Sequence, residues 1–210
     1  MALRKLFIAG STGAVGRTVT TLGRKRGADL VAHQRPKSGV EESPSVFKLD
    51  DAEKLLAALR DRTTVVQLIG TMRKRFSTGD TYETSDIGTT RQLVDAAKRA
   101  GSIDHLVLLS AVGAGKPMGA YLKAKAAAER LVIDSGIPYT IFRPSAFDGE
   151  GHKAPPGSEF LTNLFGLSRY KPIKVEALAN AILHAALNRA PLNAILEGDS
   201  LWDVVTKSAA

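Results

Sequence analysis

The sequence predicts an α/β fold in which helices cover both faces of a mainly parallel sheet. Short apolar runs alternate with amphipathic helical patterns along almost the whole chain, which indicates strand–helix–strand crossovers. Gly27, Gly101 and Gly136 stand where three of the helical patterns stop, as glycines commonly do at helix ends. The 210 residues, 44% of them apolar and 24% charged, suit one domain with a substantial core.

The expected elements follow in order along the chain. The expected strands are Lys5–Ala9, Leu30–His33, Val46–Leu49, Val65–Ile69, His105–Leu109 and Tyr139–Phe142. The expected helices are Ala14–Arg26, Asp51–Arg60, Asp86–Ala100, Tyr121–Ser135 and Val175–Arg189. Two stretches interrupt the alternation, Thr71–Ser85 and Ser145–Arg169. Both leave the carboxyl ends of strands, where open α/β sheets bind ligands, so each is either a substrate lid or an ordinary surface loop.

The composition excludes several kinds of site. With no cysteine in the chain, disulfides, thiolate metal sites and a cysteine nucleophile are excluded. His105, His152 and His184 share no metal-ligand spacing, so no metal site is expected. We expect a cytoplasmic protein, because no apolar run has the length of a signal-peptide core or a membrane span.

The chain is basic, with 29 Lys and Arg against 21 Asp and Glu and a formal net charge of +8. This charge favours anionic ligands. The basic residues are dispersed and only 6% of residues are aromatic, so no nucleic-acid partner is expected.

A glycine-rich turn is the strongest signal in the sequence. It reads Gly10-Ser11-Thr12-Gly13-Ala14-Val15-Gly16, between the first expected strand and the first expected helix. Glycines let the backbone approach a diphosphate closely, and a helix N-terminus offers it amide groups and a positive dipole end. The spacing G-x-x-G-x-x-G differs from the usual G-x-G-x-x-G. The strand–turn–helix context favours a dinucleotide site over an ordinary glycine-rich turn.

A second group of candidate residues lies later in the chain. Tyr121 and Lys125 are four residues apart at the start of an expected helix, and Ser110 ends the strand before it. Residues spaced in this way share one helix face. A lysine ammonium near a phenol lowers the phenol pKa and makes it a better proton donor to a carbonyl, and a serine hydroxyl can hold the same oxygen. A Tyr-x-x-x-Lys pair alone is also common on exposed helix faces.

In order and spacing, the motifs resemble the short-chain dehydrogenase/reductase superfamily, and most closely its atypical NmrA-like and Tat-interacting-protein-like members. The matching residues are Gly10, Gly13, Gly16, Asp50, Leu68–Thr71, Ser110, Tyr121, Lys125, Phe142–Ser145 and the closing Ala194–Gly198. The resemblance covers essentially the whole chain. It implies a Rossmann-type, doubly wound sheet and a single NAD(P)-binding domain over residues 1–210. Residues 145–210 would supply a small C-terminal extension on the substrate side.

The resemblance also implies roles for individual residues. The glycine turn would hold the cofactor diphosphate, Asp50 would contact the adenine, and Gly70 and Thr71 would line the adenosine ribose. Pro144 and Ser145 would border the nicotinamide. Lys125 would hold the nicotinamide ribose and tune Tyr121, and Ser110 would orient the substrate. Helix capping by Asp50 and strand termination by Pro144 are alternative interpretations compatible with cofactor contact.

Charge after the second expected strand predicts NADP(H) rather than NAD(H). Positions 32–38 carry no carboxylate, whereas an acidic residue there would bind a ribose 2′-hydroxyl and repel a 2′-phosphate. Arg35 can pair with a phosphate, and Lys37 adds positive charge. His33 fits a local turn and an adenosine contact equally well.

These observations predict an NADP(H)-dependent reductase of a small carbonyl or quinone-like substrate. Tyr121 would donate the proton, Lys125 would support it and Ser110 would stabilise the substrate oxygen. Two alternatives remain: an NADP(H)-binding redox sensor with a protein partner, and an epimerase or dehydratase-like enzyme. The presence of all three candidate catalytic residues favours an enzyme. A homodimer through the helices 86–100 and 121–135 is expected only by analogy with the superfamily.

Overall fold

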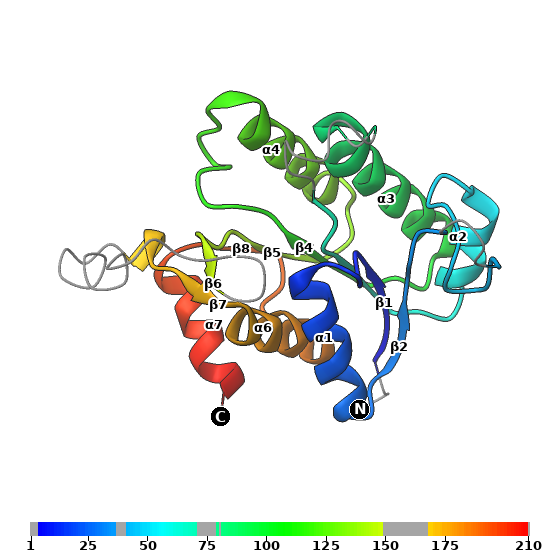
Figure 1. Ribbon diagram of the computed structural model, residues 1–210, viewed down its shortest axis with the longest axis horizontal. Coiled ribbons are helices and arrows are strands. Elements are labelled where there is room, and N and C mark those ends of the chain that lie inside the picture. The colour runs from blue at the N-terminus through cyan, green and yellow to red at the C-terminus, as the bar shows by residue number, and fades with distance from the viewer. Residues whose placement is uncertain (1–3, 37–40, 71–78, 80, 149–167, 210) are drawn as a thin grey trace.

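The computed structural model describes residues 4–36, 41–70, 79, 81–148 and 168–209. Its centre is a six-stranded, wholly parallel sheet with the strand order β2-β1-β3-β4-β5-β8 (Figure 1). The strands are β1 (Lys5–Ala9), β2 (Asp29–Ala32), β3 (Thr64–Gln67), β4 (His105–Leu109), β5 (Tyr139–Phe142) and β8 (Ala194–Leu196). The expected fold class is confirmed.

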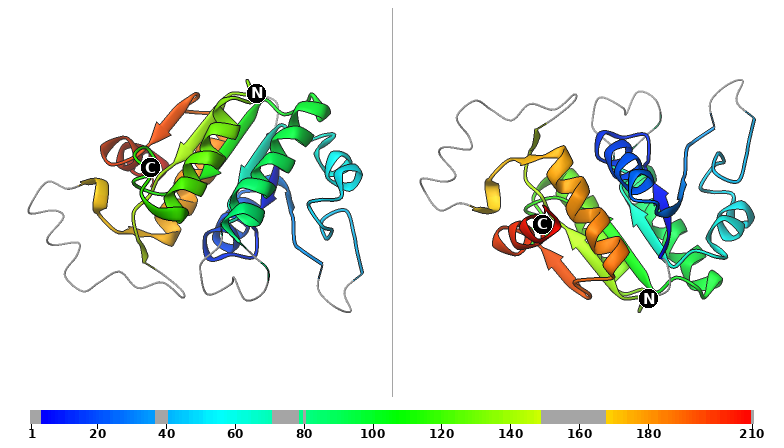
Figure 2. Two further views of the ribbon diagram at one scale, coloured as in Figure 1. Left: turned by 90° about the horizontal axis from the view of Figure 1, so that it is seen from above. Right: turned by 90° about the horizontal axis from the view of Figure 1, so that it is seen from below.

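Helices cover both faces of this sheet, as the two views of Figure 2 show. One face carries α1 (Ala14–Lys25), α6 (Val175–Asn188) and α7 (Asp199–Ala209). The other carries α2 (Ala52–Leu59), α3 (Thr89–Ala100) and α4 (Gly119–Ile133). The shorter elements are the π-helical turn η2 (Glu83–Gly88), the 3₁₀ turn η3 (Ser168–Tyr170) and the paired strands β6 (Phe147–Asp148) and β7 (Ile173–Lys174).

Alternation of side chains along the strands builds a separate core on each face. Leu6 and Ile8 of β1 pack in the cluster with α1 and α6, whereas Phe7 and Ala9 pack in the cluster with α2 and α3. All four are fully buried. A strand buried on both faces reads as a nearly continuous apolar run, which explains why β1, β3, β4 and β5 stand out in the sequence.

The strand order places the ligand-binding edge. The chain leaves β1 toward β2 and later continues on the other side of β1 with β3, so the order reverses between β1 and β3. In open α/β sheets, ligands bind outside the carboxyl ends of the strands at such a switch point. The glycine turn follows β1 there, and Gly70, Ser110 and Pro144 follow β3, β4 and β5.

Two sequence-based assignments need correction. Val46–Leu49 is not a strand: Val46 makes only isolated bridges to Gln34 and Ser43. Phe47 and Leu49 are buried as expected, because this turn folds over the core beside β2, and a core-facing turn shows the same alternating apolar pattern as a strand. The expected helix Asp86–Ala100 instead begins earlier, with the π-helical η2, and continues as α3.

The structure adds one strand to the sheet, and it leaves most of two expected loops outside the described residues. Ala194–Leu196, which was not among the expected strands, forms the sheet edge next to β5. Most of the two expected lid loops, at 71–78, 80 and 149–167, falls outside the described residues. In the part of the chain that the structure describes, no helix combines the length and the apolar character that a membrane span requires.

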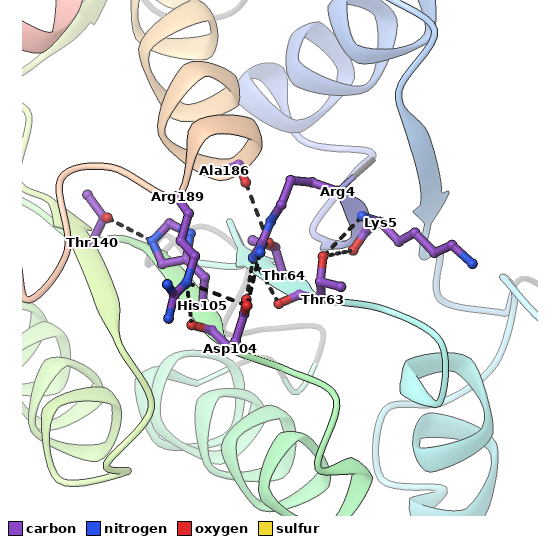
Figure 3. Close-up of polar contacts among 9 residues, drawn as sticks. All are labelled: Arg4, Lys5, Thr63, Thr64, Asp104, His105, Thr140, Ala186 and Arg189. Carbon is purple, nitrogen blue, oxygen red and sulfur yellow. Dashed lines mark hydrogen bonds and ion pairs between the residues drawn. The ribbon is translucent and has the colours of Figure 1, made fainter. Parts of the chain in front are cut away.

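The amino-terminal edge of the sheet is tied by a polar cluster, shown in Figure 3. Arg4 donates to both carboxylate oxygens of Asp104 and, at 2.8 Å, to Thr64 Oγ1. Arg189 Nε lies 3.5 Å from Asp104 Oδ2. The ring of His105 is fully buried beside them, and its Nε2 lies 2.9 Å from Thr140 Oγ1. This cluster lies at the opposite end of the strands from the glycine turn and therefore serves the fold.

Candidate functional site

The turn after β1 requires glycine at two of its positions, Gly10 and Gly16. Gly10 has a φ of +86°, and a Cβ there would lie 2.8 Å from the backbone nitrogen of Ile69. A Cβ on Gly16 would lie 2.0 Å from the Gly10 carbonyl oxygen. The Gly13 amide closes the turn by donating to the same oxygen at 3.1 Å. The backbone of α1 is therefore pressed against the end of β1, which leaves its first amide groups directed out of the sheet edge.

The other residues of the turn contribute in different ways. Ser11 donates its hydroxyl to the His33 carbonyl oxygen at 2.6 Å and so ties the turn to the end of β2. Ala14 and Val15 open α1, and the Val15 side chain packs in the core, which leaves its backbone amide for ligand contact. Gly13 caps the helix without a side chain.

A cavity of about 760 Å³ opens beside this turn. Six of the predicted cofactor-binding residues line it: Gly10, Thr12, Gly13, Arg35, Asp50 and Gly70. Residues that the sequence analysis did not assign also line it: Lys48, Leu49, Leu68, Ile69, Glu83, Thr84, Ser85, Gly88, Thr89 and Gln92. A cavity of this size is typical of a small-molecule or cofactor site.

The end of the cavity after β2 is cationic and partly aromatic. Arg35 and Lys48 both line this wall. His33, which lies beside them, is 2% exposed and packs edge-on against Phe47 with ring centroids 4.6 Å apart. Burial is the main reason that the pKa of His33 is lowered, and Arg35 lowers it further. A neutral ring is thus expected in this wall at neutral pH.

The helix α4 places Tyr121, Lys125 and Glu129 on one face, each four residues after the last. The Lys125 ammonium lies 5.9 Å from the centre of the Tyr121 ring and 2.9 Å from Asp86 Oδ1 of η2. It also donates to the Leu109 carbonyl oxygen at 3.3 Å. A Cβ on Gly70 would lie 2.9 Å from Lys125 Nζ. Because Gly70 also lines the cavity, the predicted catalytic lysine lies directly behind the cavity wall.

The pKa of Tyr121 is raised, not lowered as the sequence analysis expected. Partial burial is the largest cause; Lys125 lowers the pKa as expected, but Asp86 and Tyr82 raise it. The Tyr82 ring lies 5.6 Å from that of Tyr121. The expectation considered the lysine alone and missed the carboxylate paired with it.

Ser110 is buried, and its hydroxyl is already engaged. It donates to Glu129 Oε1 at 2.5 Å. Arg143 binds the same carboxylate through Nε at 2.8 Å and Nη2 at 2.5 Å, and reaches Glu197 with Nη1 at 3.1 Å. The hydrogen bond to Glu129 is the main reason that the pKa of Arg143 is raised. The hydroxyl proton of Ser110 is thus used in the bond to Glu129, and the hydroxyl can offer the site only an acceptor lone pair. Stabilising a substrate oxygen, the role expected for Ser110, would require that proton.

The remaining predicted residues lie away from the cavity or outside the described chain. Pro144 and Ser145 follow β5 at the correct edge of the sheet but do not line the cavity. Ser145 donates to the Lys171 carbonyl oxygen at 2.5 Å. Lys37 and Thr71 fall outside the described residues. Within the described ranges, no group of three His, Asp or Glu side chains could hold a metal ion.

Three charged residues of the site, Lys48, Asp86 and Glu129, were not among the predicted site residues. Glu129 could have been found by extending the four-residue spacing of Tyr121 and Lys125 by one more turn. Lys48 precedes Asp50, and its place in the cavity wall depends on the turn that was mistaken for a strand. Asp86 gave no signal, because a helix was expected to start there and a first-turn carboxylate needs no other explanation.

Comparison with known proteins agrees with this geometry. Residues 10–189 match the model of a family described as NAD(P)H-binding. The chain is 30% identical over 223 residues to the chloroplastic divinyl chlorophyllide a 8-vinyl-reductase of Cucumis sativus, covering 91% of this chain and 51% of that protein. It thus spans about half the length of this curated relative.

Solved structures share the fold at low sequence identity. A short-chain dehydrogenase/reductase superfamily protein from Agrobacterium tumefaciens with bound NAD superposes with a TM-score of 0.68 at 17% identity, covering 98% of this chain and 82% of that one. A structure described as AtPrR2 with NADP+ and (+)pinoresinol superposes with a TM-score of 0.67 at 16% identity, covering 93% and 70%.

Proposed function

Since this chain belongs to the NAD(P)H-binding family, among the atypical short-chain dehydrogenase/reductases, we propose that it is an NADP(H)-dependent oxidoreductase that reduces a small carbonyl or quinone-like substrate. One observation carries the proposal: Gly70 lines the cavity, and a Cβ on it would lie 2.9 Å from the ammonium of the Tyr121–Lys125 pair. A cofactor in the cavity and a proton donor on α4 would therefore serve the same reacting atoms.

The residues of the cavity fit a dinucleotide. The turn from Gly10 to Gly16 is closed so tightly that a Cβ at either end would meet backbone atoms, and it would hold the diphosphate. Asp50 and His33 would border the adenine, and Lys125 would hold the nicotinamide ribose. When bound, the cofactor supplies the hydride that the reduction needs.

Two cations support a preference for NADP(H). Arg35 and Lys48 line the cavity after β2, where a ribose 2′-phosphate would lie. A charge-assisted pair is worth about 1.5–3 kcal/mol, so Arg35→Ala should weaken NADPH binding about 10- to 100-fold and leave NADH binding nearly unchanged. Titration calorimetry with both cofactors tests this, with Arg24→Ala, at the last turn of α1, as the matched control. Equal weakening of both cofactors by R35A would remove the proposed phosphate contact.

Tyr121 is proposed as the proton donor. It lies at the surface with 38% of its area exposed, within reach of a substrate and of solvent that can return the proton. Tyr121→Phe should reduce NADPH oxidation with a panel of quinones and aldehydes by at least about 100-fold, with an unchanged Kd for NADPH. Unchanged turnover in Y121F would exclude Tyr121 from this role.

A redox sensor is the second candidate, and the Ser110–Glu129 hydrogen bond favours it, because a serine committed to a buried carboxylate is not ready to hold a substrate oxygen. Tight NADPH binding without turnover of any member of the panel would support the sensor. A cytoplasmic location and a homodimer through α3 and α4 stay predictions.

A further inference from the structure

We propose that Asp86 is a positioning residue that pairs with Lys125, fixes its ammonium behind the cavity wall and offsets part of its field at Tyr121. This inference rests on the proposed function for the role of Tyr121. It adds a residue to the site.

The contact between Asp86 and Lys125 is buried and closely packed. Asp86 is 1% exposed and Lys125 is 6% exposed. The carboxylate and the ammonium are 2.9 Å apart, and the Leu109 carbonyl oxygen takes another ammonium proton. On the cavity side, a Cβ on Gly70 would lie 2.9 Å from Lys125 Nζ, so a larger residue there would displace the lysine head. The lysine head is therefore held between η2, the end of β4 and the cavity wall.

The π-helical geometry of η2 is what delivers this carboxylate. The turn from Glu83 to Gly88 precedes α3 and packs against α4. A π-helical segment shifts the side chains that follow it relative to a regular helix, and such segments are frequent at functional sites. Here the shifted turn directs Asp86 inward, while its neighbour Ser85 lines the cavity.

The charges around Tyr121 come from two elements. On α4, the Lys125 ammonium favours the phenolate. On η2, the Asp86 carboxylate opposes it, and Tyr82 adds to the opposition. Glu83 of η2 and Lys123 of α4 lie farther out, around a smaller hollow between the two elements. Among the described residues, Gly70, Leu109 and Ser110 at the ends of β3 and β4 bring no charge to this place.

An unpaired ammonium near a phenol stabilises the phenolate and lowers the pKa of the phenol. A carboxylate beside the ammonium offsets part of this effect. The pKa of Tyr121 is raised, with partial burial as the largest cause; Lys125 lowers it, and Asp86 acts against Lys125.

With the cofactor bound, the substrate carbonyl carbon would receive its hydride, and the C=O electron pair would move to the oxygen. The oxygen would take the proton from Tyr121 Oη, and the phenolate would recover a proton from solvent. Asp86 would keep the Lys125 ammonium in place near the phenol ring.

The test is a spectroscopic titration that needs no substrate. Tyrosinate absorbance is followed after rapid pH jumps, so that each reading precedes unfolding, and the signal of the same variant carrying Tyr121→Phe is subtracted to isolate Tyr121. Asp86→Asn should lower the titration midpoint of Tyr121 by about one pH unit. Lys125→Met should raise it. Asp95→Asn, an exposed carboxylate on α3, is the matched control and should leave it unchanged.

The opposite signs separate a charge effect from loosened packing. If D86N leaves the midpoint at the wild-type value, or if D86N and K125M move it in the same direction, the proposal is overturned. If D86N alone does not fold, the double variant D86N/K125M, which buries neither charge, replaces it: its midpoint must lie below that of K125M. Failure of Y121F to reduce turnover would refute the proposed proton donor and leave the titration result standing.

Discussion

Replacing His105 by glutamine should make the stability of the fold less sensitive to mild acid. His105 lies in β4 with no exposed area. Thr140 gives its hydroxyl proton to the Pro191 carbonyl oxygen at 2.5 Å, so it must accept from His105 Nε2 at 2.9 Å. The proton of the neutral ring is therefore on Nε2. Nδ1 is buried, and the described residues offer it no hydrogen-bond partner.

The magnitude follows from the pKa of this ring. Burial, together with the nearby Arg4 and Arg189, lowers the pKa of His105 from 6.5 to about 4, against a smaller opposing effect of Asp104. Between these two pH values the unfolded chain binds a proton that the folded chain does not, so the free energy of unfolding falls as the pH falls. At about 1.4 kcal/mol per pH unit, this histidine should remove about 2 kcal/mol between about pH 7 and pH 5.

Urea unfolding at a series of pH values measures this effect. H105Q retains an amide donor for Thr140 and cannot titrate, so its free energy of unfolding should fall less than that of the wild type over the same range. His184→Gln, on the outer side of α6, is the control and should keep the wild-type slope. A wild-type slope in H105Q would show that the buried ring is not the group responsible, and the reasoning from its burial would fail.

Two further predictions concern the site itself. Gly16→Ala should destabilise the fold by about 1–3 kcal/mol and abolish NADPH binding, because its Cβ would lie 2.0 Å from the Gly10 carbonyl oxygen. Alanine is otherwise favoured over glycine in helices by about 1 kcal/mol, so a stabilised G16A in thermal unfolding would contradict the packing of the turn. Gly13→Ala, whose Cβ would lie 3.5 Å from the same oxygen, is the control and should fold normally. Glu129→Met should cost about 1–3 kcal/mol, since it leaves the partly buried Arg143 with Glu197 as its remaining carboxylate partner. E129M/R143M should recover part of this loss, and equal losses in both variants would argue against the ion pair.

The sequence predicted the sheet well because its central strands are buried on both faces. A strand such as β4 is then apolar at nearly every position, and this pattern can be recognised in the sequence without knowledge of the neighbouring strands. The strand predicted at Val46–Leu49 was wrong for the same reason, because burial alone produced its apolar pattern. Phe47 and Leu49 are as buried as strand residues, but the backbone there pairs with Gln34 only at an isolated bridge. Apolar alternation reports burial, and a strand also requires a continuous ladder.

The glycine turn was predictable because its constraint is local. Gly16 and Gly10 approach each other closely and are only six positions apart in the sequence. Because a side chain at either position would clash with nearby backbone, both positions require glycine, and this requirement is visible in the sequence. The cavity walls were less accessible. Lys48 reaches the site through an irregular turn, and its position depends on how Phe47 packs beneath it.

The direction of the pKa shift of Tyr121 could not be predicted from the sequence. Spacing on one helix correctly placed Lys125 near Tyr121, and the lysine does lower the pKa of the phenol. The sign of the total effect depends on burial and on Asp86, which arrives from a different element through a π-helical turn that no local pattern announced. A buried charge acts together with whatever compensates it. A Tyr–Lys pair therefore indicates a site of proton transfer, while the pKa of its phenol also depends on burial and on the carboxylate that the fold brings to the lysine.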